Sequence, residues 1–189
     1  MRPGRNKKRT RILALLVPGL MAGAYCLSAA MAGEPPRGFN EADVMFLQMA
    51  VRHEAQGVTI VRLAAGRPVA PALRTLAEAI ETTQLAEVGT MAARLRSWRR
   101  PPVAPPGSHA AHGGQPETAK EAIDAAAAAP DTEFGTRFVN LLIAHQDDAV
   151  QIARRELAQG SDPAARALAT SISRSRSAQI EQLLGLLPP

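Results

Sequence analysis

The stretch DVMFLQMAVRHEAQGVTIVR at residues 43–62 recurs in altered form, 92 positions later, as GTRFVNLLIAHQDDAVQIAR at residues 135–154. Residues of the same type stand at equivalent positions: Phe46 and Phe138, His53 and His145, Val58 and Val150, Ile60 and Ile152, and Arg62 and Arg154. The correspondence continues without a gap to Ile80 and Ile172. The chain therefore contains an internal repeat.

Each copy predicts an α-helix, because its apolar residues recur at spacings of three, four and seven. Phe46, His53 and Ile60 share one face of the first copy. Asn40 can cap that helix, and Asp43 can complete a capping box. Glycines and prolines mark the other boundaries. The expected helices cover residues 41–65, 71–100, 117–129, 133–159 and 163–187.

Four of these helices are long, and each copy of the repeat contains two of them joined by a short turn. This arrangement predicts an all-α fold in which two repeated helical hairpins pack as a four-helix bundle. The composition agrees, since aromatic residues make up only 3% of the chain. Strands favour aromatic and β-branched residues.

The first 32 residues have the composition of a signal peptide or a membrane anchor. They contain six basic residues and no acidic one, and an apolar run from Ile12 ends in Ala30-Met31-Ala32. This ending fits a signal-peptidase site, but the run is also long enough to cross a bilayer as an anchor helix. A cleaved signal peptide and an uncleaved anchor helix both fit the sequence. Either one places the remaining chain outside the cytoplasm, secreted or anchored to the cytoplasmic membrane.

The charge distribution argues against nucleic acid as a partner. The net charge of +5 comes from the leader, because residues 33–189 contain 16 basic and 17 acidic side chains. A nucleic-acid-binding domain needs a basic patch on its folded part. Cys26, the one cysteine, also lies in the leader. The folded part therefore forms no disulfide.

These features divide the chain into a leader at 1–32, a linker at 33–39 and a helical bundle at 40–187. The bundle consists of repeat one at 40–100, a connector at 101–116 and repeat two at 117–187. The connector is rich in Pro, Gly, Ala and His, which is typical of a flexible segment.

Repeat one also carries a spaced set of polar residues: Asp43-x-x-Phe46, then His53, then Gln84-x-x-Glu87 and Met91. This pattern resembles the bacterial domain of unknown function 305 family. Its members show Asp-x-x-Phe, Met-x-x-His-His and Gln-x-x-Glu-Ile-x-x-Met. The resemblance covers residues 40–187 and implies a ferritin-like four-helix fold. Some members are implicated in binding copper or other metals through histidine and methionine.

Several motif positions are changed in this chain. Glu54 and Gln146 stand where the family has its second histidine, and Ala50 and Leu142 replace motif methionines. In repeat two, Arg176 and Gln179 replace the Gln and Glu of the last motif. The chain is therefore identified as a divergent member, for which the fold transfers better than the activity.

Interior histidines are the first candidates for a binding site. His53 and His145 lie on the apolar faces of their helices, and Gln84, Glu87 and Met91 share one face of another helix. An imidazole near a carboxylate inside a bundle can form half of a metal site. A buried hydrogen-bonded pair would give the same pattern.

Methionines and the connector supply the remaining candidates. Met49 lies near His53 on the same helix, and thioether sulfur with imidazole suits Cu(I). Methionine is also a common filler of aliphatic cores. His109 and His112 form His-x-x-His in the connector, which makes them a secondary metal candidate.

Catalytic motifs are absent from the sequence. It contains no Glu-x-x-His for a di-iron centre, no Gly-x-Ser-x-Gly and no phosphate-binding glycine loop. Glu54, Asp147 and Asp148 are expected to face solvent. We interpret the chain as a non-catalytic extracytoplasmic bundle that binds copper or another transition metal through interior His, Met and Glu. The alternative is a metal-free module that presents a helical surface to another envelope protein. Neither interpretation fixes an oligomeric state.

Overall fold

The computed structural model describes residues 38–108 and 116–187, and all regular structure in these residues is helical. In chain order the elements are α1 (Glu41–Val61), the 3-10 turn η1 (Arg62–Ala64), α2 (Pro71–Ser97), α3 (Lys120–Ala127), α4 (Asp131–Gln159) and α5 (Pro163–Leu184). The expected all-α class is confirmed for this part of the chain, which has five α-helices and no strand. None of the helices described is long and apolar enough to cross a bilayer.

Two sets of predictions lie outside the described residues. The signal peptide or anchor at 1–32 is one of them, and the connector histidines His109 and His112 are the other.

The predicted capping signals account for the helix starts. Asn40 Oδ1 accepts a hydrogen bond from the Asp43 N–H at 3.0 Å, and the Asp43 carboxylate accepts from the Asn40 N–H at 2.6 Å. This reciprocal pair is a capping box. Asp162 caps α5 by accepting from the N–H three positions on at 2.8 Å. Pro71 and Pro163 occupy the first turns of α2 and α5, where a proline loses no helical hydrogen bond.

Some predicted helix boundaries were wrong by a few residues. The helix α2 ends at Ser97 instead of 100, because Trp98 closes the last turn and a prolyl pair follows. The helix α4 begins at Asp131 instead of 133, because the Pro130 carbonyl accepts from two amides of the first turn. The helix α5 ends at Leu184, where Gly185 forms the C-cap.

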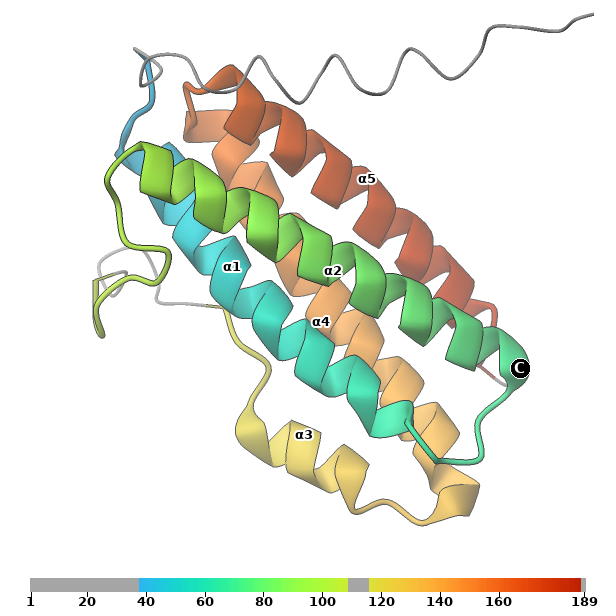
Figure 1. Cartoon of the computed structure of the whole chain (residues 1–189). Coiled ribbons are helices and arrows are strands. Elements are labelled where there is room, and N and C mark those ends of the chain that lie inside the picture. Colours follow the sequence, from blue (N-terminus) through green and yellow to red (C-terminus); the bar gives the residue numbers. More distant parts are fainter. Residues whose placement is uncertain (1–37, 109–115, 188–189) are drawn as a thin grey trace, which may run out of the picture. The chain divides into compact units, whose positions relative to one another are not determined.

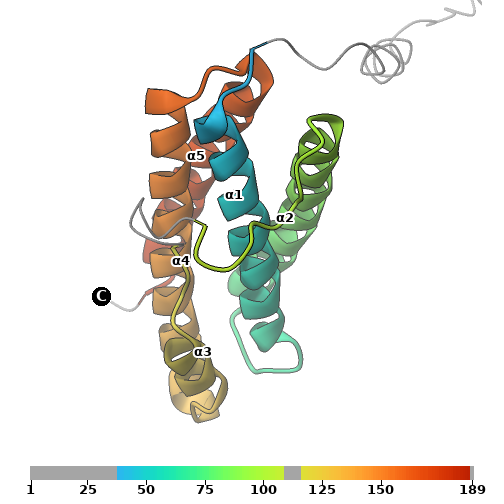
Figure 2. The ribbon, with the colours of Figure 1, turned by 90° about the vertical axis from the view of Figure 1, so that its left-hand side faces the viewer.

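The four long helices form two hairpins that meet through α1 and α4 (Figure 1). The helix α1 packs on α2 within the first hairpin, and α4 packs on α5 within the second. Figure 2 shows α1 between α2 and α4. The short helix α3 packs against α4. Because α1 has neighbours on several sides, more than one of its faces is buried.

The apolar core consists of two separate clusters. One lies between the N-terminal half of α1, the C-terminal half of α2 and the start of α5, and includes Phe46, Met91 and Ala169. The other lies at the opposite ends of these helices and includes Ile80, Phe138 and Leu183. On every long helix, buried polar residues lie between the two clusters. This polar layer is where the candidate site lies.

Candidate functional site

The polar layer crosses the middle of the helical region and draws on all four long helices. Six of its side chains are at most 1% exposed: His53, Glu54, Gln84, His145, Gln146 and Arg176. Glu87 and Gln179 lie at its edge, partly exposed. These eight residues form four pairs related by the repeat: His53 with His145, Glu54 with Gln146, Gln84 with Arg176, and Glu87 with Gln179. Four of the changed family positions therefore lie together in this layer: Glu54, Gln146, Arg176 and Gln179.

The two histidines lie face to face at the contact of α1 with α4. Their ring centroids are 3.9 Å apart, and the ring planes differ by 9°. Both side chains are fully buried, as the apolar stripes predicted. Their direct stacking was not predicted, because it depends on where the two helices cross.

Both imidazoles are neutral at neutral pH. Burial lowers the pKa of His53 well below its ordinary value, and the charges of His145 and Arg176 lower it further. Burial, with the charge of Arg176, lowers the pKa of His145 to about 4. A neutral imidazole is the form that coordinates a metal. No proton has to be removed before these rings can act as ligands.

Three of the four ring nitrogens have no hydrogen-bond partner among the described residues: both nitrogens of His53, and Nε2 of His145. The fourth, Nδ1 of His145, lies 2.9 Å from Thr118 Oγ1. Thr118 is itself held by two hydrogen bonds with the Gln56 side chain, of 2.9 and 3.0 Å. Buried polar atoms are usually paired. In the tautomer whose Nδ1–H donates to Thr118 Oγ1, Nε2 of His145 carries the free lone pair, which is the usual arrangement for a metal-binding histidine.

Gln84 reaches the histidines across Gly57. The amide of Gln84 is fully buried and both of its polar atoms lack partners within the described residues. A Cβ atom at Gly57 would lie 2.5 Å from Gln84 Oε1 and 2.6 Å from His145 Nε2. The absence of a side chain at residue 57 therefore lets the amide and the imidazole approach α1 together.

An ionic group forms the other half of the layer. Arg176 on α5 donates from Nη2 to Glu54 Oε1 at 3.2 Å and also to Glu87 Oε2. The expectation that Glu54 faces solvent was wrong, since it is 1% exposed. The reason is the wide buried surface of α1, on which consecutive residues are enclosed by different neighbours. Burial raises the pKa of the Glu54 carboxyl well above its ordinary value, and the Arg176 charge opposes this shift.

Among the predicted metal ligands that lie in the described residues, the structure brings His53, His145 and Gln84 together. Glu87 pairs with Arg176. Met91 lies in the apolar cluster beyond the layer. Arg176 was missed as a site residue, because a single arginine on a helix normally lies at the surface.

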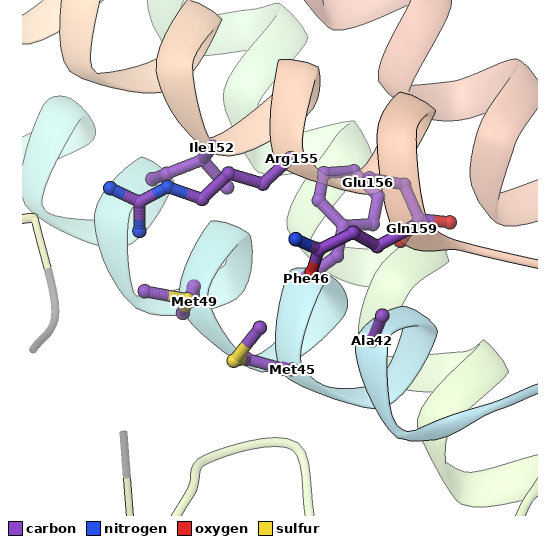
Figure 3. Close-up of a pocket in the computed structure, with 8 residues that line it drawn as sticks. All are labelled: Ala42, Met45, Phe46, Met49, Ile152, Arg155, Glu156 and Gln159. Carbon is purple, nitrogen blue, oxygen red and sulfur yellow. The ribbon is translucent and has the colours of Figure 1, made fainter. Parts of the chain in front are cut away.

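Met49 belongs to the apolar cluster next to the layer and lines a hollow between α1 and α4. Figure 3 shows Met45 and Met49 on α1, opposite Ile152, Arg155 and Glu156 on α4. The two thioethers thus line the same hollow.

The donor atoms of the layer suit a metal ion, but their present geometry does not allow both rings to bind one. Neutral imidazole nitrogens suit copper among other transition metals. However, an ion bound in the plane of one ring cannot lie in the plane of a parallel ring 3.9 Å away. One ring has to turn before both can bind the same ion. Among the described residues, no group of three or more His, Cys, Asp or Glu is placed to hold a metal ion.

The profile of a domain of unknown function, DUF305, matches residues 43–187. The chain belongs to this family. The match covers both repeats and all eight residues of the polar layer. No curated protein sequence matches the chain.

Solved structures of DUF305 proteins share the fold. A DUF305 protein from Streptomyces coelicolor is 20% identical, with a TM-score of 0.71 over 77% of this chain and 91% of that one. A DUF305 fragment from Deinococcus radiodurans is 24% identical, with a TM-score of 0.67 over 78% and 95%.

CopM is a further similar protein, and its structures include metal-bound forms. Its Cu(II)-bound form is 26% identical, with a TM-score of 0.63 over 76% of this chain and 93% of CopM. Its Cu(I)-bound form is also 26% identical, with a TM-score of 0.61 over the same shares. CopM has a silver-bound form as well.

Proposed function

We propose that this DUF305 protein is a non-catalytic, extracytoplasmic copper-binding protein whose ligands are His53 and His145. The observation that carries the proposal is the pair itself: two buried, neutral imidazoles, with three ring nitrogens that have no hydrogen-bond partner in the part of the chain that the structure describes. A hydrogen bond donated by Nδ1–H of His145 to Thr118 Oγ1 supports Nε2 of His145 in a ligand role. Copper binding by CopM, at 26% identity, supports the choice of metal.

Within this proposal each residue has a stated part. His53 and His145 hold the ion, and Gln84 offers an amide oxygen on the same side of α1 as Nε2 of His145. Thr118 positions the His145 ring. The bound copper is a cation that the protein stores or transports, and it takes part in no reaction step. The extracytoplasmic location rests on the leader at 1–32, and the ferritin-like class rests on the family resemblance.

Calorimetry on the full-length chain tests the proposal, with Cu(I) under reducing conditions and Cu(II) and Zn²⁺ in parallel. We expect Cu(I) binding to weaken by more than about 100-fold in His53→Ala/His145→Ala, because 10- to 100-fold is the usual cost of losing a residue that only supports a ligand. Leu142→Ala is the matched control, since it opens a cavity in α4 near His145 without removing a donor.

The remaining candidate ligands are tested in the same titration. Binding that survives the double histidine change but is lost in His109→Ala/His112→Ala would place the copper on the connector. Binding lost in Met45→Leu/Met49→Leu would place it in the hollow of Figure 3. Either result contradicts the histidine pair as the site.

A metal-free interaction module is the second candidate function, and one observation favours it. The histidine rings are stacked in parallel, and an ion held by both rings would have to disturb this arrangement. Under this function no copper binds at micromolar concentration, and the full-length chain retains a specific protein from an envelope extract. Absence of any retained protein above background would count against it.

A further inference from the structure

Arg176 is a charged side chain with no access to solvent. Its exposed fraction is 0%, and its ion pairs are with Glu54 and Glu87. A buried charge that loses its partner is strongly destabilising, because no water replaces the lost interaction. The guanidinium is therefore held in the layer by these two carboxyls, and they in turn are held by it.

The repeat shows what is unusual about this group. The position equivalent to Arg176 in repeat one is Gln84, an amide. The positions equivalent to Glu54 and Glu87 in repeat two are Gln146 and Gln179, whose side chains hydrogen-bond to each other. One half of the layer thus pairs two amides without a cation, and the other half sets two carboxyls around one.

We propose that the Arg176 guanidinium is a resident cation, and that it closes a carboxylate site in which Glu54 and Glu87 would otherwise bind a metal ion. Two carboxyls from different helices, α1 and α2, converge on a single positive group from a third helix, α5. Oxygen pairs of this kind are the ligands of hard divalent cations such as Mn²⁺ and Mg²⁺.

A second observation is that the polar atoms of Glu54 and Arg176 are not fully paired with each other. Oε2 of Glu54 is buried and has no hydrogen-bond partner among the described residues. Nε of Arg176 is buried and, within the same residues, unpartnered as well. The guanidinium therefore meets Glu54 through one nitrogen and one oxygen, and not as a matched two-point pair. The carboxyls of Glu54 and Glu87 also interact with each other, and this interaction raises the pKa of Glu54.

The inference is independent of copper binding at the histidines. It concerns the carboxyl half of the layer and a hard cation, whereas the proposed function concerns the imidazoles and copper. A negative result for copper binding at the histidines does not affect the proposal for the carboxyls, and the reverse is also true. If it holds, the arginine restricts metal binding in the native protein to the histidine half.

Replacement of the arginine by the residue of repeat one tests the proposal. In the full-length chain, Arg176→Gln removes the cation and leaves both carboxyls, and Arg176→Gln/Glu54→Gln removes one carboxyl as well. Arg174→Gln is the matched control, because Arg174 lies on the same helix and is exposed. The probe is Mn²⁺, read out by thermal unfolding and by electron paramagnetic resonance of the bound ion.

We expect saturating Mn²⁺ to raise the Tm of Arg176→Gln by about 5 °C or more. The native chain, Arg174→Gln and the Arg176→Gln/Glu54→Gln variant should show no such rise. If Arg176→Gln is unfolded without metal, Mn²⁺ should restore its helical circular dichroism.

Three outcomes would overturn the proposal. One is an Arg176→Gln chain that neither gains stability nor refolds with Mn²⁺. Another is an equal gain in the variant that lacks Glu54. The last is Mn²⁺ binding by the native chain that Glu54→Gln abolishes, since the arginine would then not close the site.

Discussion

Gly57 is the residue that fixes how closely the ligand candidates approach α1. Its missing Cβ leaves room for Gln84 and for Nε2 of His145. The repeat places Ala149, a residue with a Cβ, at the equivalent point of α4. The close approach therefore belongs to one side of the layer only.

Gly57→Ala should weaken Cu(I) binding by about tenfold, which is the usual cost of disturbing a residue beside a ligand. The added methyl group has to displace the Gln84 amide or the His145 ring. Gly89→Ala is the control, because Gly89 lies within α2 and its Cβ would meet nothing within 4 Å. Calorimetric titration should show unchanged affinity for Gly89→Ala. Equal affinity for both variants would show that the crowding at Gly57 does not reach the site.

Ala50 is a motif position that differs from the family pattern and lies next to His53. It lines a small hollow beside His53, together with Phe46 and Ile152. The family motif has methionine at this position. The loss of that side chain leaves the hollow and removes a thioether from the neighbourhood of the histidine.

Ala50→Met should strengthen Cu(I) binding, because it returns a soft sulfur donor next to His53. We expect a gain of about tenfold or more, corresponding to about 1.4 kcal/mol. Ala50→Leu adds similar bulk without sulfur and is the control. If both variants bind Cu(I) alike, any change comes from packing, and the hollow does not border the ligand.

At the scale of helices, Asp43 joins the start of α1 to the turn between α4 and α5. Its carboxylate accepts from the N–H groups of Ser161 and Asp162 at 3.0 and 2.9 Å. Asp162 also accepts from Arg94 on α2 at 2.7 and 2.6 Å. The position equivalent to Asp43 in repeat two is Gly135, so this junction occurs once.

Glu156 gives this junction a dependence on pH. Burial raises the pKa of Glu156 to about 8, with further contributions from the hydrogen bond and charge of Asp43. Burial also acts to raise the pKa of Asp43, but hydrogen bonds from Asn40, Glu156, Asp162 and Ser161 outweigh it and the pKa is lowered. At neutral pH the pair therefore consists of a protonated Glu156 and an ionised Asp43.

The free energy of unfolding contributed by Glu156 should fall as the pH rises from about 4.5 to about 8. In this window the folded chain holds a proton that the unfolded chain has released. The free energy of unfolding therefore decreases as the pH rises. Glu156→Gln stays neutral, so its stability relative to the native chain should increase across the same window. Taking the difference cancels the opposite contributions of the histidines, whose pKa values are lowered.

Urea unfolding at several pH values between 5 and 9 measures this difference. Glu133→Gln, an exposed position on the same helix, is the control and should show no such trend. A difference between Glu156→Gln and the native chain that is flat with pH would mean that Glu156 titrates normally.

At the scale of the whole helical region, the repeat made most of the fold predictable. The equivalence of Phe46, His53 and Ile60 to Phe138, His145 and Ile152 is enough to establish the helix period and the order of the hairpins. The helix limits followed within a few residues, because capping residues and prolines act locally.

The contents of the polar layer were less predictable. The sequence indicated that both histidines face inward, but their stacking depends on the crossing of α1 and α4. Burial of Glu54 and Arg176 was missed, because the spacing of apolar residues by itself assigns only one buried face to a helix. The long run of uncharged residues at 44–51 was the available signal, because a helix that is apolar on all sides is enclosed on all sides.

Metal binding by the histidine pair is tested most directly by a titration of the full-length chain followed through the histidine ring signals in NMR spectra. Silver(I) serves as an air-stable substitute for Cu(I), and CopM binds it. We predict that the ring signals of His53 and His145 shift together and reach their end point at one equivalent of silver. The assignment follows from His53→Ala and His145→Ala. Unchanged signals of these two rings, with shifts confined to His109 and His112 or absent altogether, would contradict it.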